Sequence, residues 1–221
     1  LVGAGRRSGA TRESVVFRHA TVWTNTSRGI LRDADVLVHE GRVLAVGERL
    51  DVNALFPGKH KPQVTEVDAS GHHLTCGIVD EHSHIALSRG VNEGSHSITS
   101  EVRMGDVVDP DDVNIYRDLD GGVTTVQLLH GSANPIGGQS AVIKLRWGVP
   151  SGEELIFKGA PPGIKFALGE NPKRTSFTVG TRRYPATRMG VEVSIRNAFL
   201  EAKAYKKSWD DYEAALKAEA S

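Results

Sequence analysis

The sequence predicts an α/β protein in which a β-rich part precedes short apolar strands and one long helix. Three observations support this class. Segments rich in β-branched residues occupy the beginning of the chain, short apolar runs that follow glycine or serine occupy its middle, and an amphipathic pattern closes it. With 39% hydrophobic and 24% charged residues among 221, the composition is that of an ordinary globular protein.

The charge balance and the cysteine content exclude several classes of protein. Lys plus Arg equals 27 and Asp plus Glu equals 27, so the net charge is zero, which argues against a general nucleic-acid binder. No stretch approaches the run of about 18 apolar residues that spans a bilayer. A single cysteine, Cys76, excludes an internal disulfide framework and a multi-cysteine zinc site. We therefore expect a small-molecule partner, with neither nucleic acid nor membrane.

The β-rich part is expected to form a β-sandwich-like domain over residues 14–75. Residues 1–13 are rich in Gly, Arg and Ser and predict a flexible lead-in. Residues 15–25 predict one strand, and residues 35–47 predict two strands joined by a turn at positions 39–42. Residues 53–63 contain two prolines and predict a loop before the next apolar run.

The remainder, residues 76–221, changes in character. Residues 121–129, 141–147 and 163–169 are short apolar runs of the kind that form buried parallel strands. The segments between them, 130–140 and 169–176, are rich in Gly, Asn, Ser and Pro and predict loops.

One long helical signal closes the chain. Apolar residues step alternately by four and three, which predicts a helix of about eight turns, with a break near Ser208 as an alternative. This spacing also fits a coiled-coil seam, but few heptads and two alanines favour an ordinary helix packed on a sheet. The positions are Val191, Ile195, Ala198, Ala202, Tyr205, Trp209, Tyr212 and Leu216.

The chemistry-bearing segment is residues 77–84. His82 and His84 lie two apart on a predicted strand, so both imidazoles point to the same face and can offer nitrogens to one cation. Asp80 has the same parity and could orient a ligand. Two histidines at the end of a surface strand are the simpler alternative, but the apolar strand, the acidic residue and the following Gly-rich loop favour a metal site.

These residues resemble the opening signature of the amidohydrolase superfamily of metal-dependent hydrolases. The signature positions are occupied by Asp68, Gly71, Gly77, Asp80, His82 and His84, with Cys76 where proline is usual. The resemblance covers roughly residues 15–185 and is closest to the imidazolonepropionase-like branch. It implies a small β-sandwich followed by the first half of a (β/α)8 TIM-type barrel, with GGVTTVQLL as the second barrel strand.

The resemblance also implies a third metal ligand. In many superfamily members a lysine captures carbon dioxide, and the resulting carbamate bridges two divalent ions. Lys165 follows a glycine on an apolar strand and resembles that bridging lysine. Glu170 at the end of the same strand is the competing ligand, and Lys144 is a further candidate with a plainer role. We expect His82, His84 and Lys165 to bind one or two divalent ions, zinc being favoured.

His130 follows the second predicted barrel strand, where side chains of a barrel line the active site. It is therefore a candidate substrate contact, with a loop-stabilising role as the equal alternative.

The chain is shorter than the implied architecture. A (β/α)8 barrel takes about 250 residues, and the further ligands and the general-base aspartate that the superfamily uses are expected beyond the chain end. We therefore expect a truncated barrel that needs its C-terminal half or a second chain. Alone, it should be inactive and prone to aggregate or to form a homo-oligomer.

The implied function is hydrolysis of C–N bonds in amides, cyclic amides or dipeptide-like substrates. Two alternatives stay open: a mononuclear deaminase or imidazolonepropionase-like enzyme in which Lys165 has no metal role, and a non-catalytic half-barrel remnant.

Overall fold

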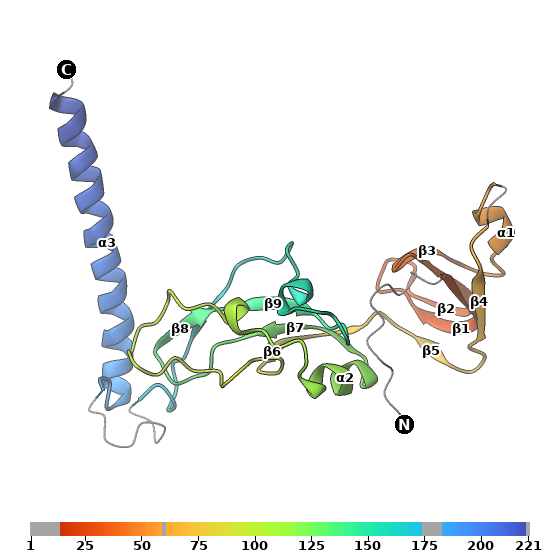
Figure 1. Ribbon diagram of the computed structural model, residues 1–221, viewed down its shortest axis with the longest axis horizontal. Helices are drawn as coiled ribbons and strands as arrows, with labels where there is room; N and C mark the ends of the chain where they lie inside the picture. Colours follow the sequence, from red (N-terminus) through yellow and green to blue (C-terminus); the bar gives the residue numbers. More distant parts are fainter. Residues whose placement is uncertain (1–13, 59–60, 174–182, 220–221) are drawn as a thin grey trace. The chain divides into compact units, whose positions relative to one another are not determined.

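The computed structural model describes residues 14–58, 61–173 and 183–219 (Figure 1). The lead-in predicted for residues 1–13 and the end of the loop predicted for 169–176 lie outside these ranges. The chain divides into two compact units that meet between Ile78 and Val79, and each is described by itself. Both sheets and helices are present, so the predicted α/β class is confirmed. The predicted boundaries at 13/14 and 75/76 stay predictions.

The first unit contains one mixed sheet of five strands in the order β3-β2-β1-β4, with β5 also paired to β1. β1 pairs antiparallel with β2 and parallel with β4 and β5, so it is the central strand. The β-rich part of the sequence thus forms one β unit, as a single sheet in place of two packed ones. Its strands are β1 (Ser14–Trp23), β2 (Ile30–His39), β3 (Arg42–Gly47), β4 (Val64–Asp68) and β5 (His73–Leu74).

The predicted hairpin over residues 35–47 is confirmed. β2 and β3 pair antiparallel through His39 and Arg42. The two residues between them, Glu40 and Gly41, have φ angles of 51° and 75°, in the left-handed region that a tight two-residue hairpin turn requires. Buried small and β-branched side chains form the core of this unit: Ala20, Val22, Ala34, Val36 and Ala69.

The loop predicted for residues 53–63 begins with a short helix instead, α1 (Val52–Leu55). The Asp51 side chain accepts hydrogen bonds from the backbone N–H groups of Asn53 and Ala54, which satisfies donors that a helix start leaves free.

The second unit holds two small sheets, several short helical turns and the long C-terminal helix. One sheet has the order β6-β7-β9, and the other pairs β10 with β8. The elements are β6 (Ile78–Ser83), η1 (Met104–Val107), α2 (Val113–Asp120), β7 (Val123–Leu128), β8 (Ile136–Gln139), β9 (Ala141–Lys144), η2 (Gly152–Leu155), β10 (Ile164–Phe166) and α3 (Arg188–Glu219).

The predicted parallel direction is wrong for two of the strands. β9 pairs antiparallel with β7, and β10 pairs antiparallel with β8. A parallel neighbour needs a crossover connection, usually a helix. The connection from Leu128 to Ala141 contains no helix, so the chain returns beside β7 in the opposite direction. β8 itself lies inside the predicted 130–140 loop, which is a second correction.

Strand β8 is held in place by close packing of its glycines. A Cβ atom on Gly137 would lie 2.6 Å from His130 Nδ1, and one on Gly138 would lie 2.7 Å from Val102 Cγ2. Two adjacent glycines have little intrinsic β propensity, so the environment imposes the strand.

The core of the second unit lies between the β6-β7-β9 sheet and the short helical segments. Its buried side chains include Met104, Ile115, Val126, Leu128, Ile143 and Leu155. Helix α2, which the sequence analysis missed, contributes Ile115 to it. No helix among the described residues combines the length and the apolar character needed to cross a bilayer.

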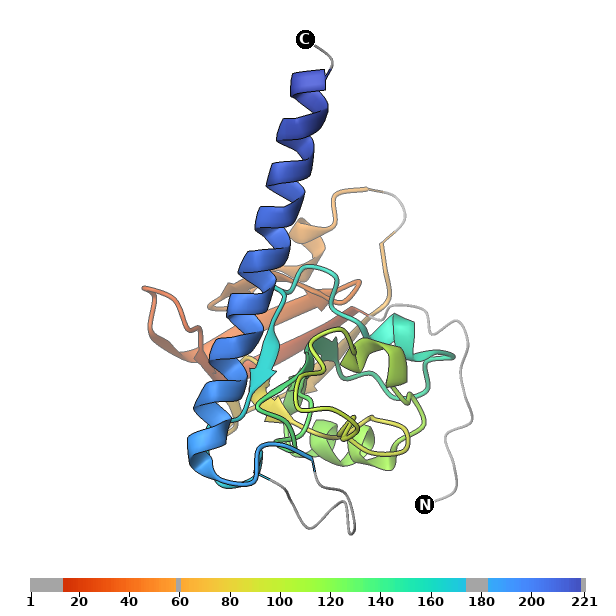
Figure 2. The same ribbon diagram turned by 90° about the vertical axis from the view of Figure 1, so that its left-hand side faces the viewer.

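Helix α3 runs without a break from Arg188 to Glu219, so the alternative break near Ser208 is not present. Near its start, Val191 and Ser194 are buried. Phe199 stacks on Phe166 of β10, with ring centroids 6.3 Å apart and planes 5° apart, and Figure 2 shows β10 alongside this part of the helix.

Candidate metal centre

The two predicted ligands lie together at the end of β6. His82 lies in the strand and His84 directly follows it. Their ring centroids are 5.3 Å apart in an edge-to-face arrangement, so both rings occupy the same side, as the alternation of a strand predicts. Leu129 N–H donates to Ser83 O at 3.1 Å, which joins this point to the end of β7.

The protonation of His84 is set by a backbone group. Its Nδ1 lies 2.9 Å from the carbonyl oxygen of Leu129, which can only accept, so Nδ1 donates and Nε2 keeps its lone pair. Desolvation lowers the pKa of His84, the Leu129 bond raises it, and the positive charges of His82 and Lys165 lower it, for a net decrease. The neutral form that ligates metals is therefore favoured.

Lys165 approaches the pair from another sheet. Its neighbours Ile164 and Phe166 line an apolar groove against α3, and because side chains alternate along a strand, Lys165 points to the opposite side of β10. Its Nζ lies 3.5 Å from Nε2 of His82, across 83 residues of sequence. The three predicted metal-site residues are thus brought together.

The other acidic and basic candidates are engaged elsewhere. Glu170 is exposed and forms an ion pair with Lys173, and the Lys144 amine lies 4.7 Å from the centroid of the Phe157 ring. Asp80 Oδ1 accepts from the backbone N–H of His82 at 3.0 Å and so holds the main chain rather than a ring. Within the described ranges, no group of three His, Cys, Asp or Glu side chains could hold a metal ion.

His130 is buried, and backbone groups engage both of its ring nitrogens. Nε2 accepts from Glu93 N–H at 2.7 Å, so Nδ1 carries the proton and donates to Gly131 O at 2.8 Å. Burial lowers the pKa of this imidazole, in keeping with its neutral form. These bonds favour the loop-stabilising role over the predicted contact with substrate, which remains untested.

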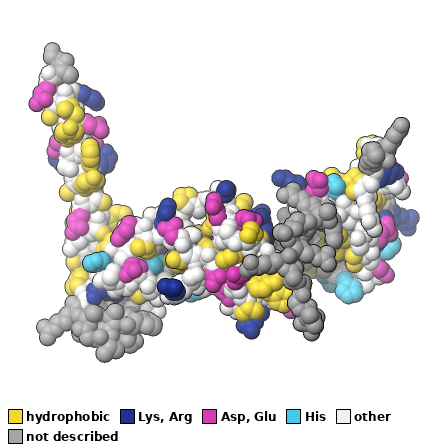
Figure 3. All heavy atoms as spheres, viewed as in Figure 1, with side chains coloured by type: hydrophobic (Ala, Val, Ile, Leu, Met, Phe, Trp, Pro, Cys, Tyr) yellow, Lys and Arg dark blue, Asp and Glu magenta, His cyan; other side chains and the backbone are white. Residues whose placement is uncertain are grey.

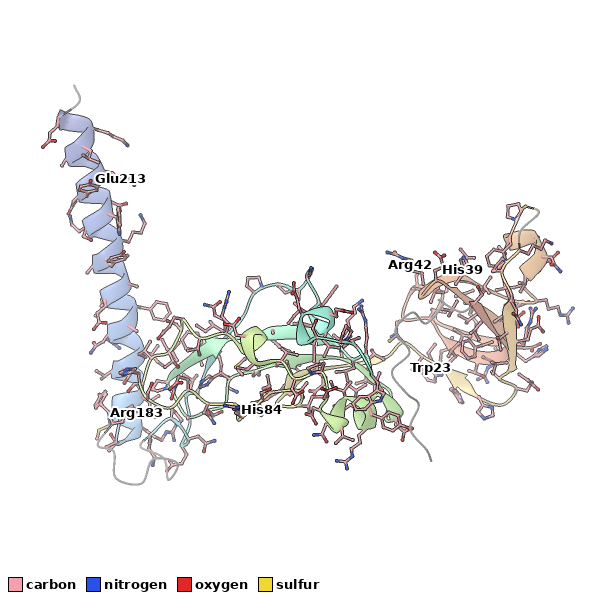
Figure 4. The ribbon with its side chains drawn as sticks, in the orientation of Figure 1. Trp23, His39, Arg42, His84, Arg183 and Glu213 are labelled. Carbon is pink, nitrogen blue, oxygen red and sulfur yellow. The ribbon has the colours of Figure 1, made fainter. Side chains whose placement is uncertain are left out.

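Sequence reasoning missed the polar network around this loop. Asn134 is fully buried and donates to Glu93 O and to Thr99 Oγ1, both at 2.6 Å. Arg183 donates to Asn134 Oδ1 at 2.7 Å and to Ala133 O at 2.6 Å. Figure 4 labels Arg183 and His84 in this unit. The only signal in the sequence was the concentration of Asn and Gly in the predicted loop.

The donor set fits a divalent ion in part. Two imidazole nitrogens on one side of a strand end are suitable zinc ligands. The Lys165 amine lies within hydrogen-bond reach of His82 Nε2, and its role as a further ligand stays a prediction. The fold and site together therefore define a mixed α/β protein with a candidate metal centre at a strand end.

Comparisons with known proteins give the family. No family model matches the chain. The amidohydrolase tasK of Hapsidospora irregularis is 35% identical over 195 residues, which cover 80% of this chain and 19% of tasK. The crystal structure of an amidohydrolase from Thermotoga maritima MSB8 is 40% identical, with a TM-score of 0.72 over 89% of this chain and 49% of that one. The chain thus spans about a fifth of the length of tasK and about half of the length of the Thermotoga amidohydrolase.

Over the part that these proteins match, the chain belongs to the amidohydrolase superfamily. The resemblance found in residues 65–85 is confirmed at this level. The imidazolonepropionase-like branch stays a prediction.

Proposed function

We propose that this chain forms part of a metal-dependent hydrolase that acts on C–N bonds of small amides, cyclic amides or dipeptide-like substrates. The observation that carries the proposal is the convergence of His82, His84 and Lys165 from two sheets, with Lys165 Nζ 3.5 Å from His82 Nε2. The relatives named amidohydrolase support the same reaction class.

In this proposal, His82 and His84 would hold the ion, zinc being favoured, and Lys165, once carboxylated, would supply a ligand for a second ion. Zinc held there would supply a Lewis acid for the substrate carbonyl and would lower the pKa of a bound water toward neutrality. The hydrogen bond from His84 Nδ1 to Leu129 O fixes the ring and leaves the lone pair of Nε2 free to bind an ion. The remaining ligands and the general-base aspartate come from a C-terminal half or a second chain.

Metal content tests the site directly. The purified chain, dialysed against zinc and analysed for bound metal, should retain zinc, and His82→Ala with His84→Ala should remove it. The matched control replaces two exposed histidines, His72→Ala with His96→Ala, and should retain it. A double variant at positions 82 and 84 that binds as much zinc as the parent would contradict the proposed site.

A variant of Lys165 distinguishes a site that binds two metal ions from a site that binds one. Lys165→Ala should lower only the occupancy of a second ion, and added short carboxylates should partly restore it. If the parent binds one ion and Lys165→Ala leaves it unchanged, the mononuclear deaminase or imidazolonepropionase-like alternative is correct.

In this proposal, activity requires the part of the relatives that the chain does not span. The chain alone should not turn over N-acyl amino acids or cyclic amides. Mixed with the segment of the Thermotoga amidohydrolase that it does not match, it should, and His82→Ala should abolish the turnover. A mixture that binds zinc and forms a stable complex, yet cleaves no amide, would favour the non-catalytic remnant.

A further inference from the structure

The last four turns of α3 carry an apolar face that the described fold leaves exposed. We call Tyr205, Trp209, Tyr212 and Leu216 the upper stripe; each is between 47% and 66% exposed. Trp209 packs edge-to-face with Tyr205 and with Tyr212, with centroids 6.4 and 6.0 Å apart, so the side chains form one continuous surface. Hydrophobic side chains recur along α3 in Figure 3. Exposed apolar faces of this kind mark interaction sites.

The second unit covers only the first part of the apolar face of α3, of which the upper stripe is the last part. Val191 is buried, and Ala198, Ala202 and Tyr205 line an apolar groove with Ile136 and Phe166. Every described residue from 199 to 219 is exposed. The sequence-based preference for a helix packed on a sheet therefore holds only for the lower part of α3.

The spacing of the stripe indicates a helical partner. Its eight positions, from Val191 to Leu216, alternate by four and three residues without interruption, which is a repeat of 3.5 residues. A strict repeat of 3.5 keeps one seam facing another helix of the same repeat. A second copy of α3 has that repeat by definition.

The charges beside the upper stripe suit a second copy in the antiparallel direction. Lys206 and Glu213 lie seven residues apart on one flank, whereas the other flank carries Ser208 and Ala215. Antiparallel pairing places equal flanks together, so each Lys206 lies near the partner's Glu213 and the small residues meet on the opposite side. Helix dipoles also favour this direction.

The contact between the first half of α3 and its own unit also favours the antiparallel direction. Because Phe199 is stacked on Phe166, the lower helix is fixed to its own unit. Antiparallel pairing of the exposed turns leaves the two units at opposite ends of the coil.

We propose that the upper stripe is a dimerisation surface, on which a second copy of this chain pairs as an antiparallel two-stranded coiled coil. Trp209 then packs against the partner's Tyr212, and Tyr205 against the partner's Leu216. Since only about two heptads take part, the dimer should be weak and should form only as the concentration of the chain rises. This inference does not depend on the proposed hydrolase function.

Sedimentation of the full chain over a range of concentrations tests the dimer. The parent should shift from monomer to dimer, and Trp209→Glu with Tyr212→Glu should stay monomeric while circular dichroism shows that α3 is retained. A parent that is monomeric at every concentration, or a dimer that survives this double variant, would overturn the proposal. Either result would show that a second copy of this chain does not bind the upper stripe.

A charge swap tests the direction. Lys206→Glu and Glu213→Lys should each weaken the dimer about tenfold, and the two together should restore it. Lys206 also forms an ion pair with Asp210 of its own helix, which Lys206→Glu breaks. The control is therefore Lys207→Glu, which breaks the corresponding pair with Asp211 but lies away from the stripe and should leave association unchanged. A swap that fails to restore the dimer would overturn the antiparallel pairing.

Disulfide trapping tests the direction of pairing independently. It is carried out in a Cys76→Ser variant, so that no native cysteine can react. Lys206→Cys combined with Glu213→Cys should cross-link two chains. The seam variant Leu216→Cys alone should not, because in the antiparallel pair it faces the partner's Tyr205, whereas in a parallel pair it would face its own copy. Efficient cross-linking by Leu216→Cys alone would show a parallel pair and overturn the proposal.

Discussion

Asp35 is a buried carboxylate whose neighbours all favour its charged form. Arg18 donates to Oδ2 at 2.7 Å, and the backbone N–H groups of His19 and Leu50 donate at 3.2 and 2.9 Å. Burial by itself would raise the pKa of Asp35, but these hydrogen bonds and the Arg18 charge outweigh it and hold the pKa below its ordinary value. The carboxylate therefore joins β1, β2 and the segment after β3.

Asp35→Asn should lower the free energy of unfolding by roughly 2–3 kcal/mol at neutral pH, because Arg18 keeps the exposed Glu66 but loses the buried one of its two carboxylate partners. Since the folded pKa is depressed, this contribution is complete above the ordinary Asp pKa of about 3.9 and is lost as pH falls through the lower folded value. Denaturant titrations between pH 7 and pH 2 measure both effects. Glu40→Gln, at an exposed turn, is the control and should change stability little at neutral pH. Equal acid sensitivity in Asp35→Asn and parent would refute the assignment.

At the scale of single elements, strand β8 depends on having no side chain at Gly137. Gly137→Ala places a methyl group 2.6 Å from the His130 ring, which is itself held by two backbone groups and cannot move freely. We expect a loss of roughly 1–3 kcal/mol, measured by chemical denaturation. Gly169→Ala meets nothing within 4 Å and serves as the matched control. Equal costs for the two variants would show that β8 is not packed as described.

Asp112 connects the start of α2 to the chain beyond β6. Its Oδ1 accepts from Asn114 N–H at 3.0 Å and its Oδ2 from Ala86 N–H at 2.6 Å. Asp112→Ala should cost about 2–3 kcal/mol, since it removes a cap and leaves the N–H of buried Ala86 unpaired. Asp51→Ala removes the cap of the four-residue α1, which buries nothing, and should cost less. Chemical denaturation checks this prediction, since the unfolding midpoint of Asp112→Ala should lie below that of Asp51→Ala.

The elements show which parts of the fold a sequence can predict. The hairpin around Glu40 and Gly41 and the length of α3 follow from local patterns, and both were predicted. The direction of β9 was not, because a short apolar run does not indicate its partner strand. β8 was missed because its glycines are kept extended by His130 and by pairing with β10, contacts that no local pattern contains.

The candidate site shows the same limit at the scale of the whole molecule. The common side of His82 and His84 could be predicted because they share one strand. The approach of Lys165 came only from the family resemblance, since its strand pairs with β8 and not with β6. The bonds that occupy His130 depend on Glu93 and Gly131, so its predicted contact with substrate could not be weighed from sequence alone.

If the proposed metal centre forms, zinc should stabilise the whole chain. Zinc at about 100 times its dissociation constant adds about 2.7 kcal/mol to the free energy of unfolding, provided that the unfolded chain binds it weakly. Thermal unfolding should therefore shift upward with zinc and return with a chelator. The His82→Ala, His84→Ala double variant should show neither shift. A shift of the parent's size in that variant would mean that zinc stabilises the protein elsewhere.

The central position of β1 also bears on the order in which the protein can assemble during synthesis. β1 ends at Trp23, yet its parallel neighbours β4 and β5 are completed only at Leu74. The hairpin of β2 and β3 can dock on one side early, while the other side of β1 has no native partner until about fifty more residues have left the ribosome. For that interval a β-branched strand presents an open edge, and this is the stage at which a chaperone would have most to protect.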